Sequence, residues 1–120
     1  MLAGRLTPAR LSQPFYRRDS VGNTLQTIVA PAANVAGVIV TRCGTGGVND
    51  NCRIMAKASA PTGLDDGAAN TLCYNPNDAA TGRMGPVNVS TPIVVPPGLG
   101  VYAITGIASQ SFCYVEYEVL

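Results

Sequence analysis

Residues 112–119 have the sequence FCYVEYEV, and this stretch decides the fold class. Its residues alternate between two faces of a strand, with Cys113, Val115, Tyr117 and Val119 on one face and Phe112, Tyr114, Glu116 and Glu118 on the other. A period of two is typical of a β-strand that packs on one side and meets water on the other. We therefore predict a half-buried strand at this end of the chain.

Similar short strands, separated by clusters of turn-forming residues, are predicted upstream. We expect them at residues 25–29, 37–43, 52–59, 71–74, 87–95 and 99–107. In residues 52–59 the outward face would carry Arg53, Met55, Lys57 and Ser59, so Lys57 is interpreted as a solvated surface lysine. No window shows the 3.6-residue apolar period of a helix. The prediction is an all-β protein, a small β-sandwich or jelly-roll-like domain.

Prolines interrupt the later strands at two places. Pro92 should break residues 87–95, because proline cannot donate to a strand ladder. Pro96-Pro97-Gly98 should turn the chain into residues 99–107. By contrast, residues 60–86 are rich in turn-formers and are expected to form a long irregular loop, of the kind that is usually functional or ordered by a partner.

Residues 1–22 differ in charge from the rest and are predicted to be an extended basic arm ahead of a domain at 23–120. Four arginines against one aspartate give the arm a net charge of +3, whereas four basic and six acidic residues give the remainder −2. We interpret the arm as an anchor to partner subunits. Its apolar contacts and its arginines are Leu2, Arg5, Leu6, Arg10, Leu11, Phe15, Tyr16, Arg17 and Arg18.

Composition argues against catalysis and nucleic-acid binding. The chain lacks His, the usual general base, and its net charge is only +1. Glu116 and Glu118 lie two apart on one strand face, which is weak evidence for a glycosidase pair. Charged residues make up 12% of the chain, about half the usual share. We expect a non-enzymatic protein whose neutral surface packs against other proteins.

The four cysteines do not match a zinc motif, and no cofactor is expected. A hairpin disulfide between Cys43 and Cys52 is one possibility, since turn-formers separate them. The interpretation we favour is four reduced thiols packed as small apolar groups. Calcium is a less favoured alternative in the loop, where the candidate oxygen ligands are Asp65, Asp66, Asn75, Asn77 and Asp78.

The sequence matches no secretory or membrane signal, which predicts a protein that is made in a cytosol. Residues 1–20 contain Arg and Pro throughout and do not match a secretory signal, and the longest apolar runs fall far short of a membrane helix. We expect neither a membrane nor a nucleic acid as partner.

Two segments carry a resemblance to a known class of protein. Residues 27–40, TIVAPAANVAGVIV, combine a strand, an Ala/Asn turn and a second strand, and residues 93–104, IVVPPGLGVYAI, combine a strand, a Pro-Gly turn and a strand. Together they resemble small β-sandwich virion proteins of tailed bacteriophages. The resemblance implies a capsid decoration, or cement, subunit that is synthesised in the host cytoplasm and located in the virion. It also implies a homo-oligomer that contacts the major capsid protein or other virion subunits.

The alternative function is a receptor- or carbohydrate-binding module of a fibre or tail. Such a module would use Tyr74, Asp78 and neighbouring loop residues to contact its ligand. Decoration of a capsid and recognition of a glycan therefore remain as competing hypotheses.

Overall fold

The computed structural model describes residues 13–19, 25–48, 51–64, 66, 69–76, 87–105 and 110–120. Within these ranges only the backbone is described for residues 13–19, 46–48, 51, 75–76, 105 and 110–112. The described residues form nine β-strands and one short 3-10 helix, and the strands pair antiparallel in two sheets. The predicted all-β fold is confirmed.

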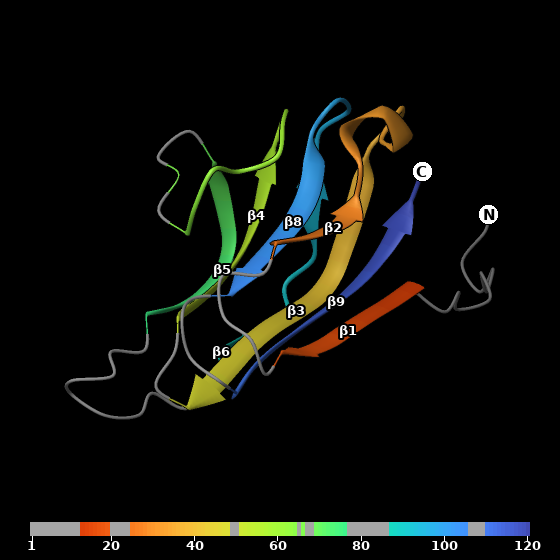
Figure 1. Ribbon diagram of the computed structural model, residues 1–120. Helices are drawn as coiled ribbons and strands as arrows, with labels where there is room; N and C mark the ends of the chain where they lie inside the picture. Colours follow the sequence, from red (N-terminus) through yellow and green to blue (C-terminus); the bar gives the residue numbers. More distant parts are fainter. Residues whose placement is uncertain are drawn as a thin grey trace, which may run out of the picture.

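Sheet A is the five-stranded sheet. Its strands are, from one edge to the other, β1 (Gln13–Asp19), β9 (Gln110–Val119), β3 (Val38–Val48) and then β6 (Val87–Val89) and β7 (Ile93–Val95), which pair with successive parts of β3. Figure 1 shows β1, β9 and β3 side by side in one layer. The long β3 is therefore the strand that joins both halves of this sheet.

Sheet B is the four-stranded sheet. Its order is β2 (Leu25–Val29), β8 (Gly100–Thr105), β4 (Asn51–Lys57) and β5 (Asn70–Pro76). It forms the second layer in Figure 1, and the 3-10 helix η1 (Pro31–Ala33) lies between β2 and β3 in the chain.

The two sheets pack through inward-facing small side chains. The six from sheet A are Val38, Val40, Cys43, Val95, Cys113 and Val115. The six from sheet B are Val29, Ile54, Ala56, Cys73, Val101 and Ala103. The predicted inward positions Cys113 and Val115 are confirmed, because β9 alternates between the core and the outer face. A core of Val, Ala and Cys suits two closely packed sheets, since each side chain fills little volume.

The proline predictions are confirmed. Pro92 lies between β6 and β7, which are two separate strands. In the turn at residues 96–99, the Leu99 N–H donates to the Pro96 carbonyl at 3.3 Å and Gly98 has φ +84°. Pro at the second position and a positive-φ Gly at the third are the preferences of a type II turn.

Asn34 joins the two segments that carry the resemblance. Its buried side-chain amide donates to the Pro96 carbonyl at 2.7 Å and to the Leu99 carbonyl at 2.9 Å. In return, the Gly98 N–H donates to the Asn34 carbonyl at 2.9 Å. The Ala/Asn turn and the Pro-Gly turn therefore form one hydrogen-bonded unit at one end of the sandwich.

Sheet B is covered on its outer face. Met55, Tyr102 and Ile104 form a second buried cluster there, packed against Leu64 and Ala69 from the segment between β4 and β5. The predicted outward exposure of Met55 is therefore wrong, because its side chain is 0% exposed. Strand alternation placed it on the correct face, but that face is not wet.

The segment at residues 60–86 is not irregular throughout. The strand predicted at residues 71–74 is confirmed, and it extends to Asn70–Pro76 as β5. Residues 65, 67, 68 and 77–86 lie outside the described residues.

Candidate functional site

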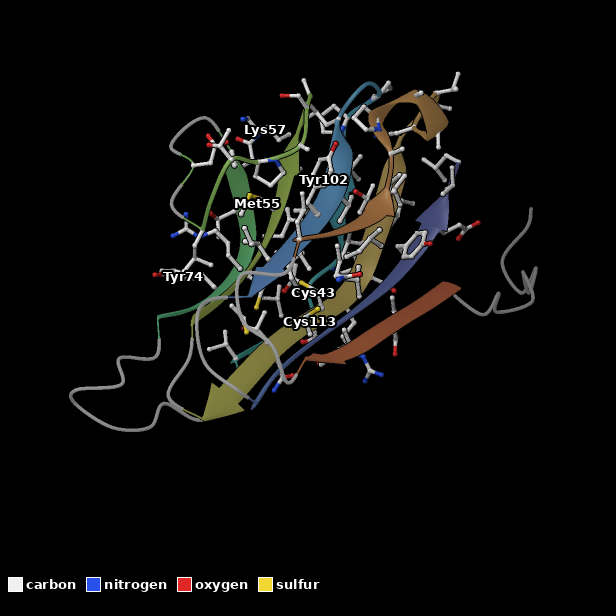
Figure 2. All side chains as sticks on the ribbon, viewed as in Figure 1. Cys43, Met55, Lys57, Tyr74, Tyr102 and Cys113 are labelled. Carbon is white, nitrogen blue, oxygen red and sulfur yellow. The ribbon has the colours of Figure 1, made fainter. Side chains whose placement is uncertain are left out.

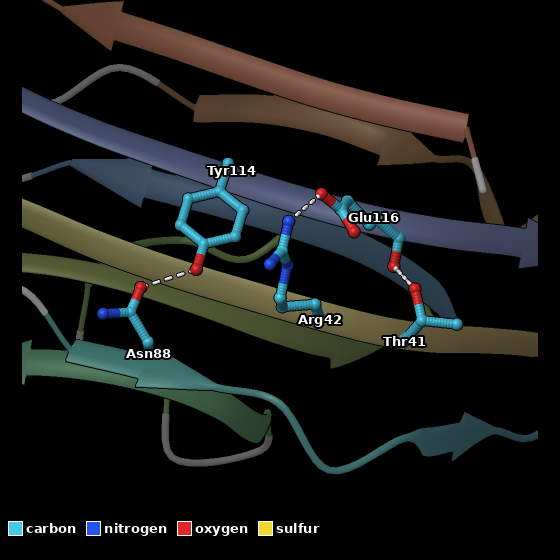
Figure 3. A network of polar contacts seen from close by, with 5 residues as sticks. All are labelled: Thr41, Arg42, Asn88, Tyr114 and Glu116. Atoms are coloured by element: carbon cyan, nitrogen blue, oxygen red, sulfur yellow. Dashed lines mark hydrogen bonds and ion pairs between the residues drawn. The ribbon is translucent and has the colours of Figure 1, made fainter. Parts of the chain in front are cut away.

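The outer face of sheet A carries three residues side by side on β6, β3 and β9. Gly44 pairs with Asn88 on one side and with Tyr114 on the other. The Tyr114 hydroxyl donates to Asn88 Oδ1 at 2.5 Å (Figure 3). Because Gly44 lies between these two residues in the sheet, the tyrosine ring crosses over it. A Cβ on Gly44 would lie 2.4 Å from Tyr114 Cε1. The absence of a side chain at Gly44 therefore allows the tyrosine to lie flat on the sheet.

The next contacts along the same strands are charged. Arg42 Nη2 donates to Glu116 Oε1 at 2.6 Å, and the guanidinium lies 5.9 Å from the centroid of the Tyr114 ring. The β3–β9 register shifts between Val40 and Arg42, where the Thr41 hydroxyl donates to the Glu116 carbonyl at 3.0 Å (Figure 3). We call Asn88, Tyr114, Arg42 and Glu116 the polar ladder.

The polar ladder is accessible and its side chains are already ordered. The side chains of Arg42 and Glu116 are 54% and 34% exposed, and Asn88 is also exposed. Further along the sheet, Ile39 pairs with Val94, which is 65% exposed. The face thus combines an aromatic ring, both charges and an apolar border, a mixture that suits contact with another protein.

Glu116 and Glu118 do not form an isolated carboxylate pair. Glu116 is bound to Arg42, and Glu118 is half-buried opposite Ile39 in the β3–β9 ladder. The geometry gives Glu116 a structural role in the polar ladder.

The predicted anchor residues divide into two groups. Leu2, Arg5, Leu6, Arg10 and Leu11 lie outside the described residues. Phe15, Tyr16, Arg17 and Arg18 lie in β1, whose backbone pairs with β9 from Gln13 opposite Tyr117 to Asp19 opposite Ser111. Residues 13–19 of the predicted arm therefore form an edge strand of sheet A, next to the strand that carries Tyr114 and Glu116. Its anchoring role stays a prediction.

On sheet B, Lys57 is not the solvated lysine that alternation predicted. Its ammonium binds Asp66 Oδ2 at 2.5 Å, and the two side chains are only 16% and 9% exposed. The same carboxylate oxygen accepts the Thr62 N–H at 3.2 Å. This ion pair fastens the segment after β4 over the buried Met55 cluster.

The residues named as candidates for calcium or glycan binding are described only in part. Asp66 is bound to Lys57, Asn75 lies in β5, and Asp65, Asn77 and Asp78 lie outside the described residues. Within the described ranges, no three His, Cys, Asp or Glu side chains are grouped to hold a metal ion. Tyr74 lies under the Arg53 guanidinium, 4.0 Å from the ring centroid. Arg53 thus covers one face of the ring of Tyr74, the residue that a receptor- or carbohydrate-binding module would use.

The Cys43–Cys52 disulfide is not formed, and all four cysteines are buried free thiols. The strands on either side of the turn, β3 and β4, belong to different sheets, so they do not form the hairpin on which that possibility depended. Instead, Cys43 lies in the same buried cluster as Cys73 on β5, and Figure 2 places the Cys43 and Cys113 side chains between the two layers.

Comparison of the sequence with known proteins does not suggest a function for this chain. No protein-family model matches the chain, and no curated protein is similar enough to suggest its function. In the described part of the chain, no helix has the length and apolar character to cross a membrane. Asn88, Arg42 and Gly44 were not predicted as site residues, because they become neighbours only through the pairing of β3 with β6 and β9.

Proposed function

We propose that this protein is a non-enzymatic structural subunit of a tailed-bacteriophage virion, a capsid decoration or cement protein. It binds the major capsid protein or other virion subunits through the outer face of sheet A and the N-terminal segment. The observation that supports a binding role most strongly is the polar ladder, an accessible set of side chains held in place before any partner arrives.

An ordered face favours association because binding normally costs side-chain entropy. The Tyr114 ring is held by Asn88, and the Arg42 guanidinium is held by Glu116. Tyr and Arg are also the residue types enriched where protein interfaces concentrate their binding energy. A partner that covers the ladder would therefore gain contact area at low cost in freedom.

The N-terminal segment extends this surface. β1 is the edge strand next to β9, and the basic residues of positions 1–12 precede it in the chain. Twelve residues can span at most about 40 Å. Arginines and leucines at that reach can pair with carboxylates and apolar pockets of an adjacent subunit.

The virion location rests on the resemblance of residues 27–40 and 93–104, which the Asn34 hydrogen bonds unite in one unit. In a capsid, many copies of a modest contact act together, so a low-charge face of moderate affinity is sufficient. We propose a homo-oligomer for the same reason.

Stepwise truncation tests the anchor. Capsids lacking the protein are mixed with the full chain, with a chain lacking residues 1–12, or with a chain lacking residues 1–20, and bound protein is measured after sedimentation. We expect both truncations to lower occupancy, and the longer one to lower it further because it also removes β1. Thermal unfolding of each chain controls for folding, and unchanged occupancy of a folded truncation would reject the anchoring role.

Two measurements separate decoration from receptor binding. Native mass of the purified chain should show a symmetric oligomer, whereas a stable monomer weakens the proposal. A glycan array should show no binding, because a decoration subunit is expected to bind proteins and not glycans. Reproducible glycan binding that is lost in Tyr74→Ala would instead support the fibre or tail module.

A further inference from the structure

Cys43 and Cys73 connect the two layers of the sandwich at one point. Cys43 lies on β3 of sheet A and Cys73 on β5 of sheet B, and both belong to the same buried cluster. The two thiols are close enough across the core for each to shift the pKa of the other.

The surroundings of Cys73 confirm its position against β3 and β6. Its sulfur lies 3.8 Å from the Thr45 hydroxyl oxygen, and its S–H donates to the Val87 carbonyl at 3.6 Å. Thr45 pairs with Val87 in sheet A, and Cys43 is two residues before Thr45 on β3. These two contacts hold the Cys73 sulfur over the inner face of sheet A, next to the part of β3 that carries Cys43.

The two thiols differ in acidity. Hydrogen bonds from Cys43 and from Thr45 lower the pKa of Cys73 to about 7, although burial opposes this shift. The pKa of Cys43 is raised, first by its hydrogen bond to Cys73 and then by burial. A thiol with a pKa near neutrality is the more effective nucleophile, which assigns the attacking role to Cys73.

We propose that Cys43 and Cys73 form a disulfide between the two sheets when the protein meets a small disulfide oxidant, such as oxidised glutathione. This inference does not depend on the proposed function. The alternative use of clustered thiols, a metal site, lacks the further ligand that it would need among the described residues.

The reaction balances as two thiol–disulfide exchanges. The Cys73 thiolate attacks one sulfur of the oxidant, forming a mixed disulfide and releasing one thiolate. Cys43 then loses its proton to solvent and attacks the Cys73 sulfur, forming the Cys43–Cys73 bond and releasing the second thiolate. Both released thiolates take up protons, so the two cysteines are oxidised and the oxidant is reduced to two thiols.

The position of Cys73 explains how a buried thiol can react. Among the described strands, β5 is at the edge of sheet B and pairs with β4, whereas Cys113 lies on β9 between β1 and β3. Edge elements open locally at lower free energy than central strands. Oxidation should therefore begin at Cys73, and the second exchange should follow as β5 closes again over Cys43.

The bond should stabilise the sandwich because it closes a loop of about 30 residues in the unfolded chain. A closed loop of that length should raise the unfolding midpoint by about 10 °C.

The test uses the full chain incubated with oxidised glutathione at pH 8, with reduced protein as the reference. We expect a mass loss of about 2 Da per chain, one disulfide peptide that joins Cys43 to Cys73, and the increase in midpoint. Cys43→Ala and Cys73→Ala should abolish all three results, each relative to its own reduced form. Cys52→Ala and Cys113→Ala are matched controls and should retain them.

Peptide mapping of the unsubstituted protein keeps the proposal testable if a variant does not fold. Brief alkylation of the native reduced chain should label Cys73 before the other three cysteines. The proposal would be overturned by a disulfide that joins any other pair of cysteines, by the absence of a mass loss, or by a Cys43–Cys73 disulfide that does not raise the unfolding midpoint.

Discussion

The outer faces of the two sheets differ in whether another segment of the chain covers them. On sheet B, Met55 and Tyr102 are buried beneath the segment that follows β4. On sheet A, Tyr114 and Arg42 remain accessible and are ordered by hydrogen bonds to neighbouring strands. Both faces carry a tyrosine and an ion pair, yet one is part of the protein interior and the other is a surface.

The difference lies in what covers each ion pair. Lys57 and Asp66 are largely excluded from water, and their attraction holds the covering segment in place. Arg42 and Glu116 lie in solvent, where an ion pair contributes little to folding but still fixes the direction of both side chains. The outer face of sheet B therefore contributes to stability, whereas the outer face of sheet A presents an ordered surface to solvent.

The strongest test of this contrast compares the two tyrosines. Tyr102→Ala should lower the free energy of unfolding by about 3–5 kcal/mol, because it empties the buried cluster on sheet B. Tyr114→Ala should cost markedly less, because its ring is only half-buried. Urea unfolding of both variants checks this prediction, and equal losses would show that the two faces are not different in kind.

The two ion pairs should differ in the same direction. Asp66→Ala should destabilise the protein by about 3 kcal/mol, because it leaves the Lys57 ammonium partly buried without its counter-ion. Glu116→Ala should have little effect on stability, since Arg42 is exposed. Denaturant titrations decide the matter. The double variant Lys57→Met/Asp66→Leu should be more stable than Asp66→Ala. If it is not, the unpaired buried ammonium is not the cause of the loss.

Gly44 offers a smaller and more local change. Gly44→Ala should cost about 1–3 kcal/mol, because the new methyl group collides with the Tyr114 ring and with Asn88 Oδ1. Gly63→Ala is the matched control, since nothing lies within 4 Å of the added carbon. Unfolding measurements give the energies, and the NMR resonances of Tyr114 should shift only in the first variant. A silent Gly44→Ala would contradict the close packing of the ring.

The smallest expected effect on stability is at Arg42. Arg42→Gln should leave the unfolding midpoint nearly unchanged, while it weakens capsid binding because the guanidinium no longer presents its charge beside Tyr114. Thermal unfolding and capsid sedimentation of the same sample separate the two effects. A folded variant that binds as well as the parent would remove Arg42 from the binding face.

Regular alternation and turn chemistry were sufficient to predict much of the fold. The two faces of residues 113–117, the break at Pro92 and the turn at residues 96–99 all follow from local rules, and each is present. These features depend on neighbours within a few residues. Local sequence therefore carries the information for them.

Features that depend on distant segments were not predicted. Burial of Met55 requires Leu64 and Ala69, which show no periodicity that would reveal a cover. The Cys43–Cys73 contact crosses from one sheet to the other, so no spacing in the chain reports it. Pairing of β1 with β9 was missed because a Pro- and Arg-rich segment resembles an arm more than a strand.

Two exposed valines provide the most direct test of the central claim that the outer face of sheet A is the binding surface. Val94 lies on that face and is 65% exposed, whereas Val35 lies in the turn after η1 and is 78% exposed. Val94→Asp and Val35→Asp therefore introduce the same charge at two accessible sites. Capsid occupancy, measured by sedimentation of folded protein, should fall at least about tenfold for Val94→Asp, which corresponds to about 1.4 kcal/mol. It should remain at the parent level for Val35→Asp. Equal occupancy of the two variants would contradict the account.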